Sequence, residues 1–439
     1  MRQNMQRSHE SDDISRRSFL GRTGLAAAAV AGGSVARFAR GQEAATSTGV
    51  RGANNRIGIG FIGCGGRGGN HMDYITQLRK NGEKVEIVAV CDVYRPRVER
   101  AAKKYGGKAY MDHRELLADA NVDAVCIATP DHIHGYQVID AVRADKDVYC
   151  EKPVTHWRQF ELTKRMTAEV KKSGRVFQLG VQYMSDTAWH QARKLVKDGL
   201  IGRPIHAEMG YFRVGDWGER GMPIDDPNAR PGPDLNWEAF LGDSPKRPFD
   251  VSRFFRWRMY EDYSGGPVTD LFPHCFSPTA WVLDVGMPSM VVATGGKFRY
   301  EEREVPDTFN MLIDYPEKFT VAVLGTQGND YPGGTPRGPL GRSPIIRGWE
   351  GTLTFEGNEI VFTPAAESKK KPQRFPIEHA DDVLRFWQDF LACCRTRQTQ
   401  TPSPVDLAYH VQTALQMGAL ALREGKVAKF DAAQEKIVL

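Results

Sequence analysis

Short apolar runs alternate with amphipathic stretches through the first half of the chain. Runs of this length are typical of parallel strands buried on both faces, and the stretches between them have the spacing of helices. We therefore expect the repeated β-α-β units of a doubly wound sheet. The predicted strands are 57–62, 85–91, 124–128, 148–150 and 176–179, and the predicted helices are 95–105, 113–118, 134–144 and 157–172.

The pattern changes after about residue 180. Strand-like runs then follow one another without helices between them, which indicates an open antiparallel or mixed sheet. These runs are 204–212, 290–295, 308–314, 319–324 and 351–355, with helices expected at 187–198, 380–395 and 405–423. The fold class is α/β, with a first domain over 55–180 and a second over 181–439. Two Gly/Pro-rich stretches, 215–233 and 328–343, are long for connectors and suit a lid, an insertion or an oligomer contact.

The most specific motif follows the first predicted strand. Gly63, Gly65 and Gly68 fit G-x-G-x-x-G, and Asp92 closes the next strand. This layout is typical of a Rossmann dinucleotide site, in which the glycines allow a tight turn, close approach of the pyrophosphate and packing of helix on strand. We expect Gly66 and Arg67 to contact the cofactor in the same turn. Asp92 favours NAD over NADP because a carboxylate repels a 2′-phosphate, although Arg95 could soften that preference.

The first residues resemble an export signal rather than a domain. Arg16 and Arg17 stand in S-R-R-S-F-L, and an Ala/Gly-rich apolar run follows over 24–36. This order is typical of a twin-arginine (Tat) signal, so we assign 1–45 to a signal and linker and expect periplasmic or other export. No clean cleavage site is present, so a second possibility is that the leader is not cleaved and tethers the protein to the membrane. The alternative is a disordered basic tail.

The charge balance of the remainder excludes some partners. Eight arginines and four acidic residues in 1–51 supply four of the five net positive charges. The rest of the chain is close to neutral, so it lacks the excess of basic residues that is typical of proteins that bind nucleic acid. Seven cysteines without a C-x-x-C pair predict neither a disulfide framework nor a metal site. Because free nicotinamide nucleotides are scarce outside the inner membrane, an exported enzyme should hold its NAD tightly.

Two motifs follow buried strands, at the edge where open parallel sheets bind ligands. The first is Thr129-Pro130-Asp131-His132-Ile133-His134, and the second is Glu151-Lys152-Pro153. A histidine of the first motif could face the cofactor or could cap the next helix. Lys152 could move a proton to or from a substrate hydroxyl, or could be an ordinary surface lysine.

A third motif places Asp270 and His274 four residues apart, on one face if the segment is helical. Histidine is the natural acid or base near neutral pH, whereas zinc would need further ligands at close spacing. Aromatic residues and arginines in the second half suit the faces and hydroxyls of a sugar, or ordinary packing. They are Tyr183, Trp189, Tyr211, Trp217, Trp237, Phe254, Phe255, Trp257, Tyr260, Tyr263, Arg213, Arg253, Arg256 and Arg258.

The order G-x-G-x-x-G, T-P-x-x-x-H, E-K-P and G-G-x-x-x-D-x-x-x-H resembles the Gfo/Idh/MocA family of nicotinamide-dependent sugar oxidoreductases. The resemblance implies a C-terminal domain that binds substrate and makes dimer or tetramer contacts. It also implies site roles. Lys152 and His274 would act in proton transfer, Asp270 would be catalytic and bind the substrate, and His134 would lie near the nicotinamide. From their positions we also expect Thr129, Pro130, Glu151 and Lys152 at the cofactor and Tyr183 and Arg258 at the substrate. Phe272 and Ser277 stand where the family often has glycine and aspartate.

We therefore expect an exported enzyme with bound NAD that oxidises a carbohydrate or glycoside hydroxyl. The alternative is an NAD-dependent glycoside hydrolase or lyase, which oxidises the sugar transiently without net redox change. A nucleotide-binding protein without catalysis is the third hypothesis.

Overall fold

The structure, a computed structural model, describes residues 56–214, 222–331, 342–378 and 382–439. The predicted Tat signal and linker, 1–45, lie outside the described residues, as does Trp217. Within the described ranges, no helix has both the length and the apolar character to cross a membrane.

The N-terminal part folds around a six-stranded parallel sheet with the order β3-β2-β1-β4-β5-β6. This is the strand order of a Rossmann domain, so the doubly wound prediction is confirmed. The strands are β1 (Ile57–Ile62), β2 (Val85–Cys91), β3 (Lys108–Tyr110), β4 (Ala124–Ile127), β5 (Asp147–Glu151) and β6 (Phe177–Gly180). The helices are α1 (Gly66–Lys80), α2 (Arg95–Tyr105), α3 (His113–Leu117), α4 (His134–Arg143) and α5 (Phe160–Ser173).

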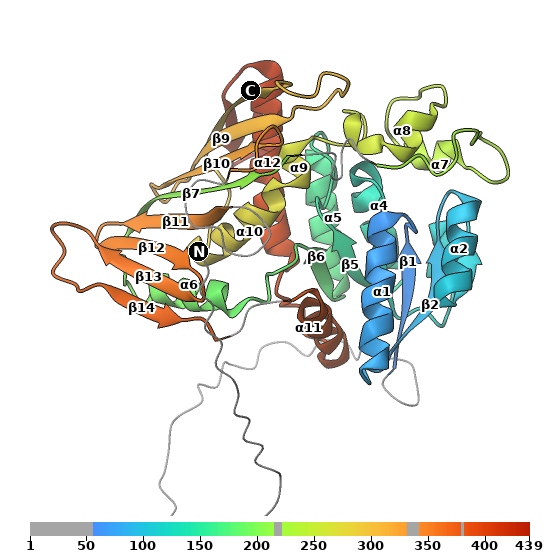
Figure 1. Ribbon diagram of the computed structural model, residues 1–439, viewed down its shortest axis with the longest axis horizontal. Helices are drawn as coiled ribbons and strands as arrows, with labels where there is room; N and C mark the ends of the chain where they lie inside the picture. The colour runs from blue at the N-terminus through green and yellow to red at the C-terminus, as the bar shows by residue number, and fades with distance from the viewer. Residues whose placement is uncertain (1–55, 215–221, 332–341, 379–381) are drawn as a thin grey trace, which may run out of the picture. The chain divides into compact units, whose positions relative to one another are not determined.

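The second sheet has ten strands in the described part of the chain, in the order β14-β13-β12-β11-β7-β10-β9-β8-β15-β16. Only β10 and β7 pair in parallel, so the prediction of a mainly antiparallel or mixed sheet is confirmed. Figure 1 shows it in green and orange beside the blue and cyan parallel sheet. The strands are β7 (Pro204–Phe212), β8 (Met290–Gly296), β9 (Thr308–Asp314), β10 (Thr320–Thr326), β11 (Arg342–Gly348), β12 (Gly351–Glu356), β13 (Glu359–Pro364), β14 (Gln373–Pro376), β15 (Ala428–Asp431) and β16 (Lys436–Val438).

One long helix connects the two sheets. In α12 (Val405–Glu424) most side chains are buried, because the helix packs on β8 of the large sheet and also on α5 and β6 of the Rossmann part. A helix that is apolar on most of its surface is suited to such an enclosed position. Helix α10 (Phe272–Leu283) packs beside it and against β7, and α6 (Thr187–Lys197) packs on α10 and on β13. In Figure 1, α10 and α12 lie between the two sheets.

The predicted range of the second domain, 181–439, includes a helix that packs on the first. In α11 (Val383–Thr396), the Trp387 ring stacks on Tyr149 of β5 with centroids 4.2 Å apart. The Trp387 indole N–H also donates to Nδ1 of His71 in α1, at 3.0 Å. The domain boundary near residue 180 stays a prediction, but residues beyond it complete the core of the Rossmann part.

Residues 222–263, which we call the strap, lie against the edge of the Rossmann sheet. The strap holds α7 (Trp237–Leu241), α8 (Val251–Phe255), the 3-10 turn η2 (Trp257–Met259) and a separate aromatic core. Its backbone joins the segment after β2, because Asn236 N–H donates to Val93 O at 2.9 Å and Asp234 O accepts from Arg95 N–H at 2.8 Å. Within the predicted stretch 215–233, the described residue Asp225 pairs with Arg97 of α2, so this part of the stretch lies against the Rossmann part.

Truncation of the buried tryptophan tests how α11 contributes to stability. We expect Trp387→Ala to lower the free energy of unfolding by about 3–5 kcal/mol, because Trp387 is fully buried and loses its stacking on Tyr149. Chemical denaturation measures this change. Trp349→Ala is the matched control, because that ring is 66% exposed and its loss should change stability little. Equal effects of the two substitutions would contradict the assignment.

Candidate functional site

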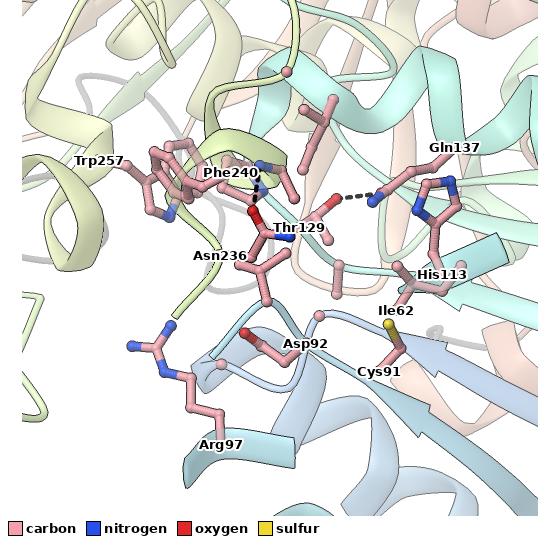
Figure 2. Close-up of a pocket in the computed structure, with 18 of the residues that line it drawn as sticks. Ile62, Cys91, Asp92, Arg97, His113, Thr129, Gln137, Asn236, Phe240 and Trp257 are labelled. Carbon is pink, nitrogen blue, oxygen red and sulfur yellow. Dashed lines mark hydrogen bonds between the residues drawn. The ribbon is translucent and has the colours of Figure 1, made fainter. Parts of the chain in front are cut away.

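A cavity of about 310 Å³ lies at the carboxyl edge of the parallel sheet. One wall comes from the turns after β1, β2, β3 and β4, and the opposite wall comes from the strap. Figure 2 shows Asp92 and Arg97 on the first side and Asn236, Phe240 and Trp257 on the second. In open α/β sheets, this edge is where nucleotides bind.

The glycine turn forms the part of the wall that suits a pyrophosphate. Gly63 has φ +96°, and a Cβ placed on Gly68 would lie 2.0 Å from Gly63 O, so both positions require glycine. A Cβ on Gly66 would meet nothing within 4 Å, so the first turn of α1 faces open space. Its N–H groups and the buried Arg67 Nη2, which has no hydrogen-bond partner among the described residues, can bind an anion. The turn therefore fits the diphosphate of NAD.

Asp92 lies in the cavity wall, where a carboxylate can accept a hydrogen bond from a ribose hydroxyl group of NAD. Its carboxylate accepts the backbone N–H of Cys64 at 2.8 Å and of Tyr94 at 3.0 Å. Burial raises the pKa of Asp92, while the Arg97 charge and these N–H groups oppose the rise.

The cation beside Asp92 is Arg97 rather than the predicted Arg95. Arg95 instead pairs with Asp234 at 2.8 Å. Arg97 lines the cavity and is held by Asp225 of the strap at 2.8 Å. Arg100 also lies 3.3 Å from the same Asp225 oxygen, so the carboxylate of Asp225 is shared by two guanidinium groups. The predicted preference for NAD over NADP therefore rests on Asp92.

Glu151 occupies a different place from the one its predicted cofactor role implies. Its Oε1 accepts from Arg67 at 2.7 Å and from Gln182 at 3.2 Å, and it lies 2.7 Å from Nε2 of His71. Burial alone would raise the pKa of Glu151, but the Arg67 and His71 interactions hold it well below its usual value. Glu151 is therefore an internal anchor for Arg67 and does not line the cavity.

His134 is also turned away from the cavity. Its ring nitrogens each lie 2.7 Å from a backbone carbonyl, Nδ1 from Pro153 O and Nε2 from Thr129 O. Burial lowers the pKa of His134, and the two carbonyls oppose that shift. The ring thus ties the turn after β4 to the turn after β5. The motif spacing could not reveal this, because it does not specify the direction of the side chain.

Lys152 and Asp270 meet as a buried ion pair. Lys152 Nζ donates to Asp270 Oδ1 at 2.8 Å and to Asp270 O at 2.6 Å. Arg258 Nε lies 3.4 Å from Oδ1, and Arg213 Nη2 lies 3.2 Å from Oδ2. Burial would raise the pKa of Asp270, but the charges of Lys152, Arg258 and Arg213 outweigh it and hold the pKa well below its usual value.

His274 belongs to the same cluster, although it does not lie on the same helix as Asp270. Asp270 ends α9 (Pro267–Asp270) and His274 lies in α10, with Leu271 between the two helices and Pro273 in the first turn of α10. Burial, and then the Lys152 charge, lowers the pKa of His274 to about 3, so its ring is neutral at pH 7. Its buried Nδ1 has no hydrogen-bond partner in the described ranges.

The predicted site residues fall into two groups. Eight line the cavity: Gly63, Gly65, Gly66, Arg67, Asp92, Thr129, Pro130 and Arg258. Gly68, His134, Glu151, Lys152, Tyr183, Asp270 and His274 are not part of its wall. Arg258 connects the groups, because it faces both the cavity and Asp270. No cluster of three or more possible metal ligands occurs among the described residues.

Tyr183 lies beyond the end of β6. It has a left-handed φ of +74°, and its carbonyl accepts the Trp189 indole N–H at 2.9 Å. Its predicted contact with substrate stays a prediction. Of the wall contributed by the strap, the sequence pointed to Arg258 and to aromatic residues such as Trp257, as possible substrate contacts, but not to Asn236.

Comparison with known proteins now identifies the family. Residues 57–181 match the model described as "Oxidoreductase family, NAD-binding Rossmann fold" of GFO/IDH/MocA, and residues 239–354 match the GFO/IDH/MocA C-terminal domain. The chain belongs to the Gfo/Idh/MocA family. Its N-terminal domain is that family's NAD-binding domain.

Among curated relatives, the chain is 31% identical over 241 residues to inositol 2-dehydrogenase of Salmonella paratyphi B. The match covers 54% of this chain and 63% of that protein, so the chain spans less than two thirds of the relative's length. Inositol 2-dehydrogenase of Rubrobacter xylanophilus is also 31% identical, over 156 residues that cover 36% of this chain and 44% of that protein.

Two solved structures share the fold. Levoglucosan dehydrogenase in complex with NADH has a TM-score of 0.63 at 19% identity, with 85% of this chain and 99% of that chain covered. Aldose-aldose oxidoreductase from Caulobacter crescentus, complexed with glycerol, has a TM-score of 0.61 at 18% identity, with 85% and 100% covered. At this identity, the likeness establishes the fold alone.

The glycine turn provides a direct test of the cofactor cavity. We expect Gly68→Ala to weaken NAD binding on the order of tenfold or more, because the new methyl group collides with Gly63 O and displaces α1. Titration of nucleotide-free protein with NAD, followed by calorimetry, measures the change. Gly69→Ala, whose methyl group meets nothing within 4 Å, should bind NAD as the wild type does. If both variants bind equally, the turn does not hold the cofactor.

Proposed function

We propose that this protein is an exported oxidoreductase that uses tightly held NAD to oxidise a hydroxyl group of a carbohydrate or glycoside. The observation that carries the proposal is the cluster of Lys152, Asp270 and His274 next to an NAD-binding cavity, with Arg258 shared by both. The cavity would hold NAD, which accepts the hydride, and the cluster would bind the hydroxyl group and take up its proton.

Each residue has a distinct task in this proposal. Bound NAD supplies the acceptor for the hydride. Lys152 donates a hydrogen bond to the reacting oxygen, and the neutral His274 ring accepts a hydrogen bond from a hydroxyl group. Asp270 holds Lys152 in place, and its remaining lone pairs bind the sugar. Fixing the reacting carbon at this position accounts for much of the expected rate enhancement.

The strap supports tight retention of the cofactor. Its aromatic side chains pack around Tyr94 directly after β2, and Asp225 pairs with Arg97 at the ribose end of the cavity. Release of a nucleotide would require these contacts to separate. A retained cofactor suits a protein that is exported with its NAD and regenerates it during each cycle, as the twin-arginine motif at Arg16-Arg17 suggests.

The substrate class follows from the relatives and from the motifs. Inositol, levoglucosan and aldoses appear in the names of the proteins to which this chain is similar. We infer a polyhydroxylated substrate of the same chemical kind. By the same family resemblance, we propose a homo-oligomer, NAD rather than NADP, and a location outside the inner membrane, with either a cleaved or a retained leader.

Mass spectrometry of the released nucleotide tests the function. Natively purified protein should contain NAD, and incubation with a panel of sugars, polyols and glycosides should convert it to NADH with at least one compound. Chromophore release from a glycoside, without lasting NADH, would instead support the transient-oxidation mechanism, which a trapped cofactor also suits. Protein without nucleotide and without measurable affinity for NAD would contradict the proposal.

Removal of the lysine separates catalysis from cofactor binding. We expect Lys152→Ala to lower turnover by roughly 100-fold or more, because the reacting oxygen loses its donor, while the NAD content stays unchanged. Steady-state kinetics and nucleotide content are measured on the same preparations. Lys172→Ala, at an exposed position of α5, is the control and should retain full activity. Unchanged turnover in Lys152→Ala would favour a nucleotide-binding protein without this chemistry.

A further inference from the structure

Arg67 is the only charged residue of the glycine turn, 63–68, and it is held from behind by a chain of buried polar side chains. Arg67 lines the cavity, and its Nε donates to Glu151 Oε1 at 2.7 Å. Its Nη2 is buried and has no hydrogen-bond partner among the described residues. A buried guanidinium N–H without a partner is costly, which indicates that a ligand binds there. At the start of α1, the diphosphate of NAD is the ligand that suits it.

The orientation of Arg67 depends on Glu151, and Glu151 in turn is fixed by His71. The side chain of His71 is fully buried in α1, and its Nε2 lies 2.7 Å from Glu151 Oε1, the oxygen that also accepts from Arg67. His71 can donate to that oxygen only if Nε2 carries a hydrogen. A neutral imidazole has a hydrogen on just one of its two nitrogens. The tautomer of His71 therefore decides whether the ring binds the Glu151 carboxylate or repels it.

Trp387 of α11 determines which tautomer His71 adopts. An indole N–H can only donate, and that of Trp387 lies 3.0 Å from Nδ1 of His71. Nδ1 is therefore the acceptor, and the hydrogen of the ring is on Nε2, where it points to Glu151. Burial, and then the Arg67 charge, lowers the pKa of His71 to about 4, which agrees with a neutral ring at pH 7. Trp387 is itself fixed by its stacking on Tyr149 of β5.

We propose that Trp387 and His71 are positioning residues for the cofactor. Acting through Glu151, they hold Arg67 in the direction in which it binds the diphosphate of NAD. The three hydrogen bonds of the chain are all between side chains, at 3.0, 2.7 and 2.7 Å. Trp387 follows His71 by 316 residues and is not part of the cavity wall, yet α11 packs on α1, beside which it lies in Figure 1. The inference concerns cofactor binding alone, so it does not depend on which substrate is oxidised.

Trp387→Phe tests the proposal, because it removes the N–H and keeps a ring that can stack on Tyr149. Nδ1 of His71 can then take up the hydrogen, and Nε2 would present a lone pair to Glu151. Protein loaded with isotope-labelled NAD and chased with unlabelled NAD gives the dissociation rate, which should rise roughly 5- to 20-fold. Phe386→Leu is the matched control, because this buried ring of α11 also packs on Tyr149, with centroids 5.9 Å apart, but has no polar atom. It should lower stability and leave the rate unchanged.

Further variants separate the hydrogen bonds from packing. His71→Gln keeps one donor and one acceptor and should release NAD at close to the wild-type rate, whereas His71→Leu, which keeps neither, should release it as fast as Trp387→Phe does. In an Arg67→Met background, Trp387→Phe should cause no further change, because the group that it positions is gone. An unchanged rate in Trp387→Phe, an equal increase in Phe386→Leu, or a full additional increase in the Arg67→Met background would overturn the proposal.

Discussion

The ion pair between Lys152 and Asp270 is the contact on which the candidate active site depends. Lys152 follows a strand of the parallel sheet, and Asp270 ends a short helix more than a hundred residues later. A buried ion pair adds little net stability, because the loss of hydration offsets most of the attraction. Its value here is positional, since it holds an amine from the NAD-binding part against the carboxylate and imidazole of the second part. The packing of α12 on β8 of the large sheet and on α5 and β6 of the Rossmann part holds Lys152 and Asp270 in this position.

The elements with strong local signals could be predicted from the sequence. Strands such as 57–62 and 85–91 are apolar and buried, and their predicted bounds agree with β1 and β2. Six strands were not predicted: β3, β11, β13, β14, β15 and β16. Among them, β3 has three residues, two of them exposed, and all four residues of β14 are exposed or half-buried. Neither presents an apolar pattern. Tertiary pairing, rather than local preference, makes such segments strands.

The candidate site, too, could be predicted from the sequence only in part. Motif order located Lys152, Asp270 and His274, and these residues do gather in one cluster. Spacing gave no information on side-chain direction, so His134 and Glu151 were expected at the cofactor although their polar atoms face the protein interior. Arg97 was missed, and the place of the strap over the cavity was not predicted, because their contacts join segments far apart in the chain, such as Arg97 with Asp225.

A crystal structure of the protein with NAD and an oxidisable polyol tests the central claim most directly. The account predicts that the nucleotide fills the cavity between the glycine turn and the strap. It also predicts a substrate oxygen within hydrogen-bond reach, about 2.6–3.2 Å, of Lys152 Nζ and of a His274 ring nitrogen. A nicotinamide ring held elsewhere, or a polyol bound out of reach of both side chains, would contradict it.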